Sequence, residues 1–333
     1  MNIYSVWHHI CHWLNTFITL LSIIIGMYYD KKFRYCLKKL AIVDITLERL
    51  GTTINYRQLY IKTVWLVVGW FVTAALINCL HILFLQYQYN YDILILICIT
   101  MAVNYCSHIN FIDDLTVASI LGYIGLQFDE INKHLQNLAS NNKQAIKRAW
   151  ENTLLDSPAQ CTLPKTSSNK QIIWTTMHLH LELCKISREI DTIFGIQTTF
   201  KMGCYFGFMA MNLHELFNLI FIKNYFINTK NMNICIQITW FFHNVLKLLF
   251  VNYMCEKVST KANATKTFAN RVLCSMCDVE INENISQLLL QMAQSPLRFY
   301  GLGLFQFGFK FLHGFTTSLT TVVVILIQAH TNE

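Results

Sequence analysis

The sequence predicts an all-α protein that crosses a membrane several times and whose helices continue well into the cytoplasm. Of its 333 residues, 54% are hydrophobic and only 14% are charged, and the mean hydropathy is +0.36. Soluble domains carry about 25% charged residues, so close to half of the usual surface charge is missing. Only three prolines and twelve glycines are present, which leaves room for long, uninterrupted helices.

Six apolar stretches are long enough to span a bilayer, because a hydrocarbon core about 30 Å thick takes roughly 20 helical residues. Each is rich in aliphatic and aromatic residues, as in "FITLLSIIIG" within the first and "VWLVVGWFVTAALINCLHILF" within the second. From the amino end, the spans are expected at about 10–28, 63–85, 93–112, 202–222, 233–251 and 311–329.

Two amphipathic segments predict that helices extend beyond the membrane. "LHLELCKISREIDTIFGIQTTF" (179–200) has apolar residues at helical spacing and leads into the fourth span, and "VLCSMCDVEINENISQLLLQMAQ" (272–294) predicts one further helix after the fifth. Between the third and fourth spans, 151–171 contains two prolines among Ser, Thr and Asn and is expected to be a mobile linker. The chain is predicted to be a single domain, 1–333, with a cytoplasmic anchor at about 113–201 and 252–310.

The basic residues indicate the orientation of the spans. The segments 30–62, 113–201 and 252–310 carry eight, nine and six Lys or Arg residues, whereas 223–232 carries two and the segments 1–9, 86–92 and 330–333 carry none. Cytoplasmic loops are enriched in Lys and Arg. The three basic segments are therefore expected in the cytoplasm, with both termini outside. This reading also explains the formal charge of +7 without nucleic-acid binding.

The sequence supports neither catalysis nor a metal or other cofactor. No nucleophile elbow, phosphate loop or dinucleotide fingerprint is present. Some His and Cys spacings are compatible with metal ligation, but membrane metal sites need several such groups, and packing or surface roles are the favoured interpretation. These residues are His8, His9 and His12, the pairs His178/Glu182 and His180/Cys184, and Cys274 with Cys277.

Polar residues in the outer halves of the spans form the first candidate site. A polar group in hydrocarbon is costly unless it faces protein or water. Two interpretations stay open, namely hydrogen bonding between helices and an outward-opening pocket for a small molecule. The candidate pocket residues are Asn78, His81, Asn104, Tyr105, Asn212, Glu215, Gln237 and Trp240.

The last span carries the second candidate site. At 100° per residue, Thr317, Thr321 and Gln328 fall within roughly 40° of one another on a helix, flanked by Val324 and Ile325. Several copies around an axis would line a water-filled path interrupted by an apolar constriction. Alternatively, the threonines bond to their own backbone and Gln328 extends toward the membrane surface.

The segment "GLGLFQFGFKFLHGFTTSLTTVVVILIQA" resembles the carboxy-terminal signature of insect gustatory receptors, in which TY, five apolar residues and QF follow one another. Thr321, residues 323–327 and Gln328 match this signature, while Val322 replaces the tyrosine and Ala329 the phenylalanine. The segments "LKKLAIVDITLERLG" (37–51) and "HLELCKISREIDTIFGIQTTF" are similar to the family's first cytoplasmic loop and its lead into the fifth helix.

This resemblance implies a tetrameric, ligand-gated cation channel in the plasma membrane, built from the same or related subunits, with a small-molecule tastant as ligand. Family members have seven helices and an extracellular carboxy terminus, so the first helix is expected to be missing here. By position, Thr321, Ile325, Gln328 and Ala329 would line the pore. A truncated, non-conducting relic of the family, a receptor of the G-protein-coupled type and a small-molecule transporter are the alternatives.

Overall fold

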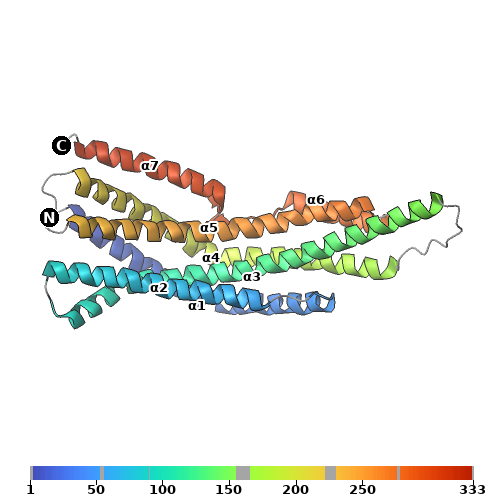
Figure 1. Ribbon diagram of the computed structural model, residues 1–333, viewed down its shortest axis with the longest axis horizontal. Helices are drawn as coiled ribbons and strands as arrows, with labels where there is room; N and C mark the ends of the chain where they lie inside the picture. The colour runs from blue at the N-terminus through green and yellow to red at the C-terminus, as the bar shows by residue number, and fades with distance from the viewer. Residues whose placement is uncertain are drawn as a thin grey trace.

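The computed structural model describes residues 3–52, 56–89, 91–154, 166–221, 230–275 and 278–331. Within these ranges, the chain forms seven helices and one two-stranded hairpin (Figure 1). The elements are α1 (Ile3–Arg49), α2 (Tyr56–Tyr89), α3 (Ile93–Leu154), α4 (Thr166–Phe221), α5 (Lys230–Ser275), α6 (Val279–Gln294), β1 (Tyr300–Gly301), β2 (Phe305–Gln306) and α7 (Phe309–Thr331).

The molecule is an elongated helical bundle, which confirms the predicted all-α membrane class. Helix α3 has 62 residues and is therefore about 93 Å long at 1.5 Å per residue, three times the thickness of a hydrocarbon core. The start of α1 and the end of α7 lie at the same end of the bundle (Figure 1). The cytoplasmic anchor at about 113–201 and 252–310 stays a prediction.

Four helical stretches are long and apolar enough to cross a membrane in the described part of the chain: Arg57–Tyr87, Ile93–Gln144, Lys230–Ser275 and Phe309–Gln328. They contain the expected spans at 63–85, 93–112 and 233–251, and all but the last residue of the one at 311–329. The spans expected at 10–28 and 202–222 lie in α1 and α4, apart from residue 222, which lies outside the described ranges.

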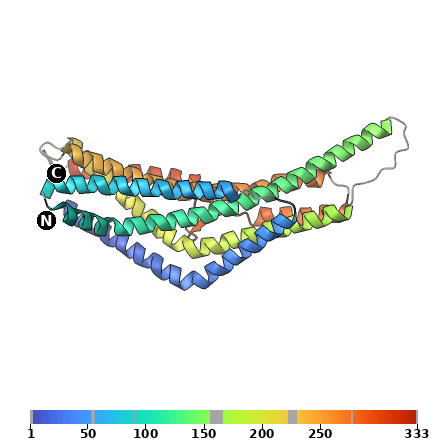
Figure 2. The same cartoon turned by 60° about the horizontal axis from the view of Figure 1, so that its bottom comes forward.

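Outside the expected spans, apolar side chains at helical spacing form a well-packed core. In α4, Leu179, Leu183, Ile186, Ile190 and Ile193 are each at most 3% exposed, and they belong to one cluster that also includes buried side chains of α1, α3 and α5. Figure 2 shows that α1 is bent near its middle, so that its second half returns to the bundle. The predicted amphipathic helix at 179–200 is thus part of α4.

The single helix predicted over 272–294 is wrong in one respect, because the chain is divided there into two helices. Helix α5 ends at Ser275 and α6 begins at Val279. The Asp278 carboxylate accepts hydrogen bonds from the backbone N–H groups of Glu280 and Ile281, which makes Asp278 the N-cap of a new helix. The linker expected at 151–171 is also shorter than predicted, since α3 continues to Leu154 and α4 begins at Thr166.

A compact turn between α6 and α7 sets the position of α7. Strands β1 and β2 pair in antiparallel fashion, and Leu302 and Gly303 between them have positive φ angles of 51° and 73°. Tyr300 N donates to the Asp191 carboxylate of α4 at 3.1 Å, and Gly308 N donates to Asn252 Oδ1 of α5 at 3.0 Å. Two helices of the bundle therefore hold the start of α7 in place.

Candidate functional site

Helix α7 has one buried face and one exposed face. Phe315 and Leu319 are 8% and 7% exposed, and the Phe315 ring lies edge-on to Phe206 of α4, with centroids 5.3 Å apart. On the opposite face, Thr317, Thr321 and Gln328 are exposed, as the predicted stripe requires. Ile325 lies on that face as well and is 57% exposed.

The threonine hydroxyls of α7 bond to their own helix, as one of the two sequence interpretations predicted. Thr316, Thr317, Thr320 and Thr321 each donate to the carbonyl oxygen four residues earlier, at 2.9–3.0 Å. A hydroxyl that donates its proton in this way keeps lone pairs as acceptors. Together with Leu312 and His313, these threonines line an open groove along α7. Ala329 belongs to α7, but its side chain lies outside the described part of the structure.

Three of the predicted pocket residues come together between α2 and α3. Asn104 Nδ2 donates to Asn78 Oδ1 at 2.9 Å and lies 3.4 Å from His81 Nδ1. His108, which the sequence analysis missed, joins them with Nε2 3.2 Å from Asn78 Nδ2. Tyr105 does not share this cluster, because its side chain is 60% exposed. His108 follows Asn104 by one helical turn, which is the signal that would have identified it.

The remaining predicted pocket residues lie on α4 and α5. Glu215 is 8% exposed, whereas Asn212 and Gln237 are only partly buried. Trp240 contacts His243 at a centroid distance of 5.6 Å, and His243 in turn contacts Phe111 of α3 at 5.5 Å. Aromatic contacts thus connect these α5 groups to α3.

A buried charged cluster joins α3, α4 and α5 near the proposed inner ends of the spans. Lys201 Nζ lies 3.0 Å from Asp114 Oδ1 and donates to the Asn110 carbonyl at 2.9 Å, and Tyr205 Oη donates to Asp114 Oδ2 at 2.5 Å. Lys247 of α5 lies over the Tyr205 ring, 5.8 Å from its centroid. The sequence signal for this cluster was the presence of ionisable residues in or next to the predicted spans, but the sequence alone did not show which of them pair.

Two of the histidines considered as metal ligands contact side chains of their own helix, α4. His180 Nε2 lies 3.5 Å from Cys184 Sγ, and the His178 ring stacks on Trp174. Over the described ranges, no three His, Cys, Asp or Glu side chains gather in a group that could hold a metal ion. The side chains of His8, His9 and His12, and residue Cys277, lie outside those ranges.

We expect Asn104→Ala to destabilise the α2–α3 contact. Hydrogen bonds between membrane helices contribute about 0.6 kcal/mol on average and up to about 1.7 kcal/mol, and Asn104 bonds to Asn78 directly. Thermal unfolding in detergent should therefore show a lower midpoint for Asn104→Ala than for Tyr105→Ala, its exposed neighbour. Equal midpoints would show that the Asn78–Asn104 bond does not stabilise the helix pair.

These features define a class, namely a polytopic helical membrane protein whose last helix exposes a polar face and whose helices enclose polar groups between them. A family model of the 7tm chemosensory receptors matches residues 5–333. The chain belongs to this family, which is a family of receptors rather than enzymes, and the resemblance found in the sequence is confirmed.

Individual relatives agree with this assignment. The chain is 20% identical over 322 residues to gustatory receptor 28b of Drosophila melanogaster, covering 91% of this chain and 65% of that protein. Its fold is similar to the insect olfactory receptor OR5 from Machilis hrabei, with a TM-score of 0.69 at 8% identity, covering 99% of this chain and 82% of OR5. The structure of OR5 in complex with eugenol gives a TM-score of 0.63 at 13% identity, covering 99% and 83% of the two chains.

Proposed function

We propose that this protein is a gustatory receptor subunit that assembles as a tetrameric, ligand-gated, non-selective cation channel in the plasma membrane. The observation that supports this most directly is the exposed face of α7, with Thr317, Thr321, Ile325 and Gln328. A single helix gains nothing by turning polar residues toward lipid. Four copies around an axis would instead line a path for water and ions.

The chemistry of that face suits cations. Each threonine hydroxyl donates its proton to its own helix and keeps lone pairs that can accept, so successive threonines would present rings of acceptors. Ile325 provides an apolar ring that excludes water when the path is narrow. Gln328 adds a ring of amides beyond it, and Ala329 is proposed by its position to line the same outer part.

The ligand is proposed to bind between the outer halves of the helices, where it would meet hydrogen-bonding groups and aromatic rings. Asn78, His81 and Asn104 supply donors and acceptors on one side. The other proposed pocket residues are Tyr105, Asn212, Glu215, Gln237 and Trp240. The structure of OR5 in complex with eugenol supports a small molecule as the ligand. Because α4 contacts α7 through Phe206 and Phe315, a shift of α4 would reach the proposed pore helix directly.

We expect Asn263 and Asn284, both in N-glycosylation sequons, to remain unmodified in expressed protein. They lie in the segment 252–310, which with 113–201 carries fifteen basic residues and is proposed to be cytoplasmic. A sequon appended after Glu333 should be glycosylated, because the carboxy terminus is proposed to be extracellular. A change in electrophoretic mobility after glycosidase treatment detects glycan on the native sequons and on the appended one. Glycan on either native site would contradict the topology.

Current recording tests the proposed function. Cells expressing this chain, alone and with related receptor subunits, should show cation currents in response to members of a tastant panel. Surface protein without current in every combination would favour a non-conducting relic of the family. Ligand-induced responses that persist without current and need a G protein, or uptake of the ligand, would favour the receptor or transporter alternatives.

A further inference from the structure

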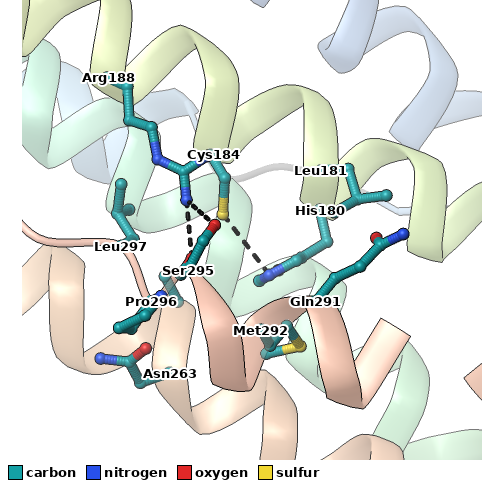
Figure 3. A pocket seen from close by; sticks show the side chains of 11 residues that line it. His180, Leu181, Cys184, Arg188, Asn263, Gln291, Met292, Ser295, Pro296 and Leu297 are labelled. Carbon is teal, nitrogen blue, oxygen red and sulfur yellow. Dashed lines mark hydrogen bonds between the residues drawn. The ribbon is translucent and has the colours of Figure 1, made fainter. Parts of the chain in front are cut away.

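A cleft on the proposed cytoplasmic part of the bundle has the features of a ligand site and takes no part in the proposed pore or pocket. Its volume is about 190 Å³, and it lies between α4, α5 and the end of α6 (Figure 3). The floor is buried and mostly apolar, with Cys184, Met292 and Leu297 at most 8% exposed. Asn263, Gln291 and Ser295 form an exposed polar rim.

Arg188 provides the charge in this cleft. It is the one Lys, Arg, Asp or Glu among the eleven lining residues. Its Nη2 donates to the carbonyl oxygen of Ser295 at 2.7 Å and to Ser295 Oγ at 2.8 Å. In the described part of the chain, no carboxylate lies within 4.0 Å of its guanidinium, so the other N–H groups can serve a bound anion.

His180 adds a second, independent feature. The residue is 2% exposed, its Nε2 lies 3.5 Å from Cys184 Sγ, and its Nδ1 has no hydrogen-bond partner within the described ranges. Burial lowers the pKa of His180 to about 4 and raises that of the Cys184 thiol to about 11, so both are neutral at pH 7. A buried polar atom without a partner is costly, and a polar ligand in the cleft would provide one.

The position of the cleft excludes a lipid headgroup as its ligand. Arg188 precedes the proposed start of the fourth span by 14 residues, which corresponds to about 21 Å along a helix. A headgroup in the bilayer does not reach that far. The volume suits a small ligand, because a cavity of about 150 Å³ holds a benzene molecule. The cleft has room for a ring or short chain of that size and one small charged group.

We propose that this cleft binds small soluble carboxylates with a compact apolar body, with the carboxylate on Arg188 and the apolar part over Met292 and Leu297. Bound there, such an anion would add to the existing link between Arg188 of α4 and Ser295, the C-cap of α6, after which the segment leading to α7 begins. Any effect on current would depend on the proposed channel function, whereas binding itself does not.

Binding to the full-length protein in detergent tests the proposal without any current measurement. Benzoate and hexanoate, followed by equilibrium dialysis and by the thermal unfolding midpoint, should bind and raise the midpoint. Benzamide should bind at least about tenfold more weakly than benzoate, because it lacks the charge that meets Arg188. Failure of both carboxylates to bind, or equal binding of benzamide, would overturn the proposal.

Variants locate the binding. Arg188→Gln should weaken benzoate binding at least about tenfold, and Arg188→Lys should weaken it less. Lys185→Gln removes a charge from the same helix outside the cleft and should leave benzoate binding unchanged. Equal benzoate affinity in Arg188→Gln and the natural protein would assign binding to another site and refute the proposal. The benzamide comparison needs no variant and decides the matter even if Arg188→Gln does not fold.

Discussion

Replacing Lys201 by methionine is expected to destabilise the protein by about 3–5 kcal/mol, the cost of leaving one partner of a buried ion pair without the other. Lys201 is 2% exposed, and its ammonium lies 3.0 Å from Asp114 Oδ1 and 3.6 Å from Asp113 Oδ2. Methionine keeps the length and apolar volume of the side chain. The loss would therefore reflect the uncompensated Asp114 carboxylate rather than a cavity.

Thermal unfolding and the monodisperse fraction in size-exclusion chromatography measure this loss. Lys185→Met, on the exposed side of the same helix, is the matched control and should behave like the natural protein. Adding Asp114→Asn to Lys201→Met should recover part of the stability, because the amide is neutral and still accepts from Tyr205. If Lys201→Met is as stable as Lys185→Met, the buried pair does not hold α3 to α4.

Substitutions at Ile325 and Ala329 of α7 are expected to change ion flow in opposite directions. Ile325→Ala should raise the basal current, because smaller side chains would weaken the proposed apolar ring, which would keep water out of the closed pore. Ala329→Phe should lower it by restoring the bulk that the family signature has at that position. Each change of about 1.4 kcal/mol in the barrier alters the flow about tenfold.

Gln328→Ala should change ion selectivity more than ligand sensitivity, because it removes a polar ring and leaves the proposed outer pocket intact. Whole-cell recording in a conducting background measures basal current, reversal potential and dose response for all three variants. Val323→Ala serves as the control, because Val323 is packed against the core on the other side of α7. Unchanged basal current and selectivity in all three would show that α7 does not line the pore.

The helices and their exposed or buried faces were readable from sequence because they depend on local periodicity. Leu183, Ile186 and Ile190 predicted an amphipathic helix, and they are buried in α4. Thr317 and Thr321 were placed on one face by the 100° rotation per residue, and both are exposed there. The start of α6 was also readable in principle, since Asp278 precedes Glu280 at the beginning of an apolar pattern.

Contacts between distant segments were decided by the tertiary structure. Lys201 and Asp114 are 87 residues apart, and no periodicity predicts which of several ionisable residues near the spans will meet. The cleft at Arg188 needs α4, α5 and α6 at once, so none of its three walls indicates it alone. Composition and periodicity determined the class, the helices and the polar face of α7, because each is a property of one segment. The pairing of buried charges and the cleft depend on how helices pack, which only the folded chain specifies.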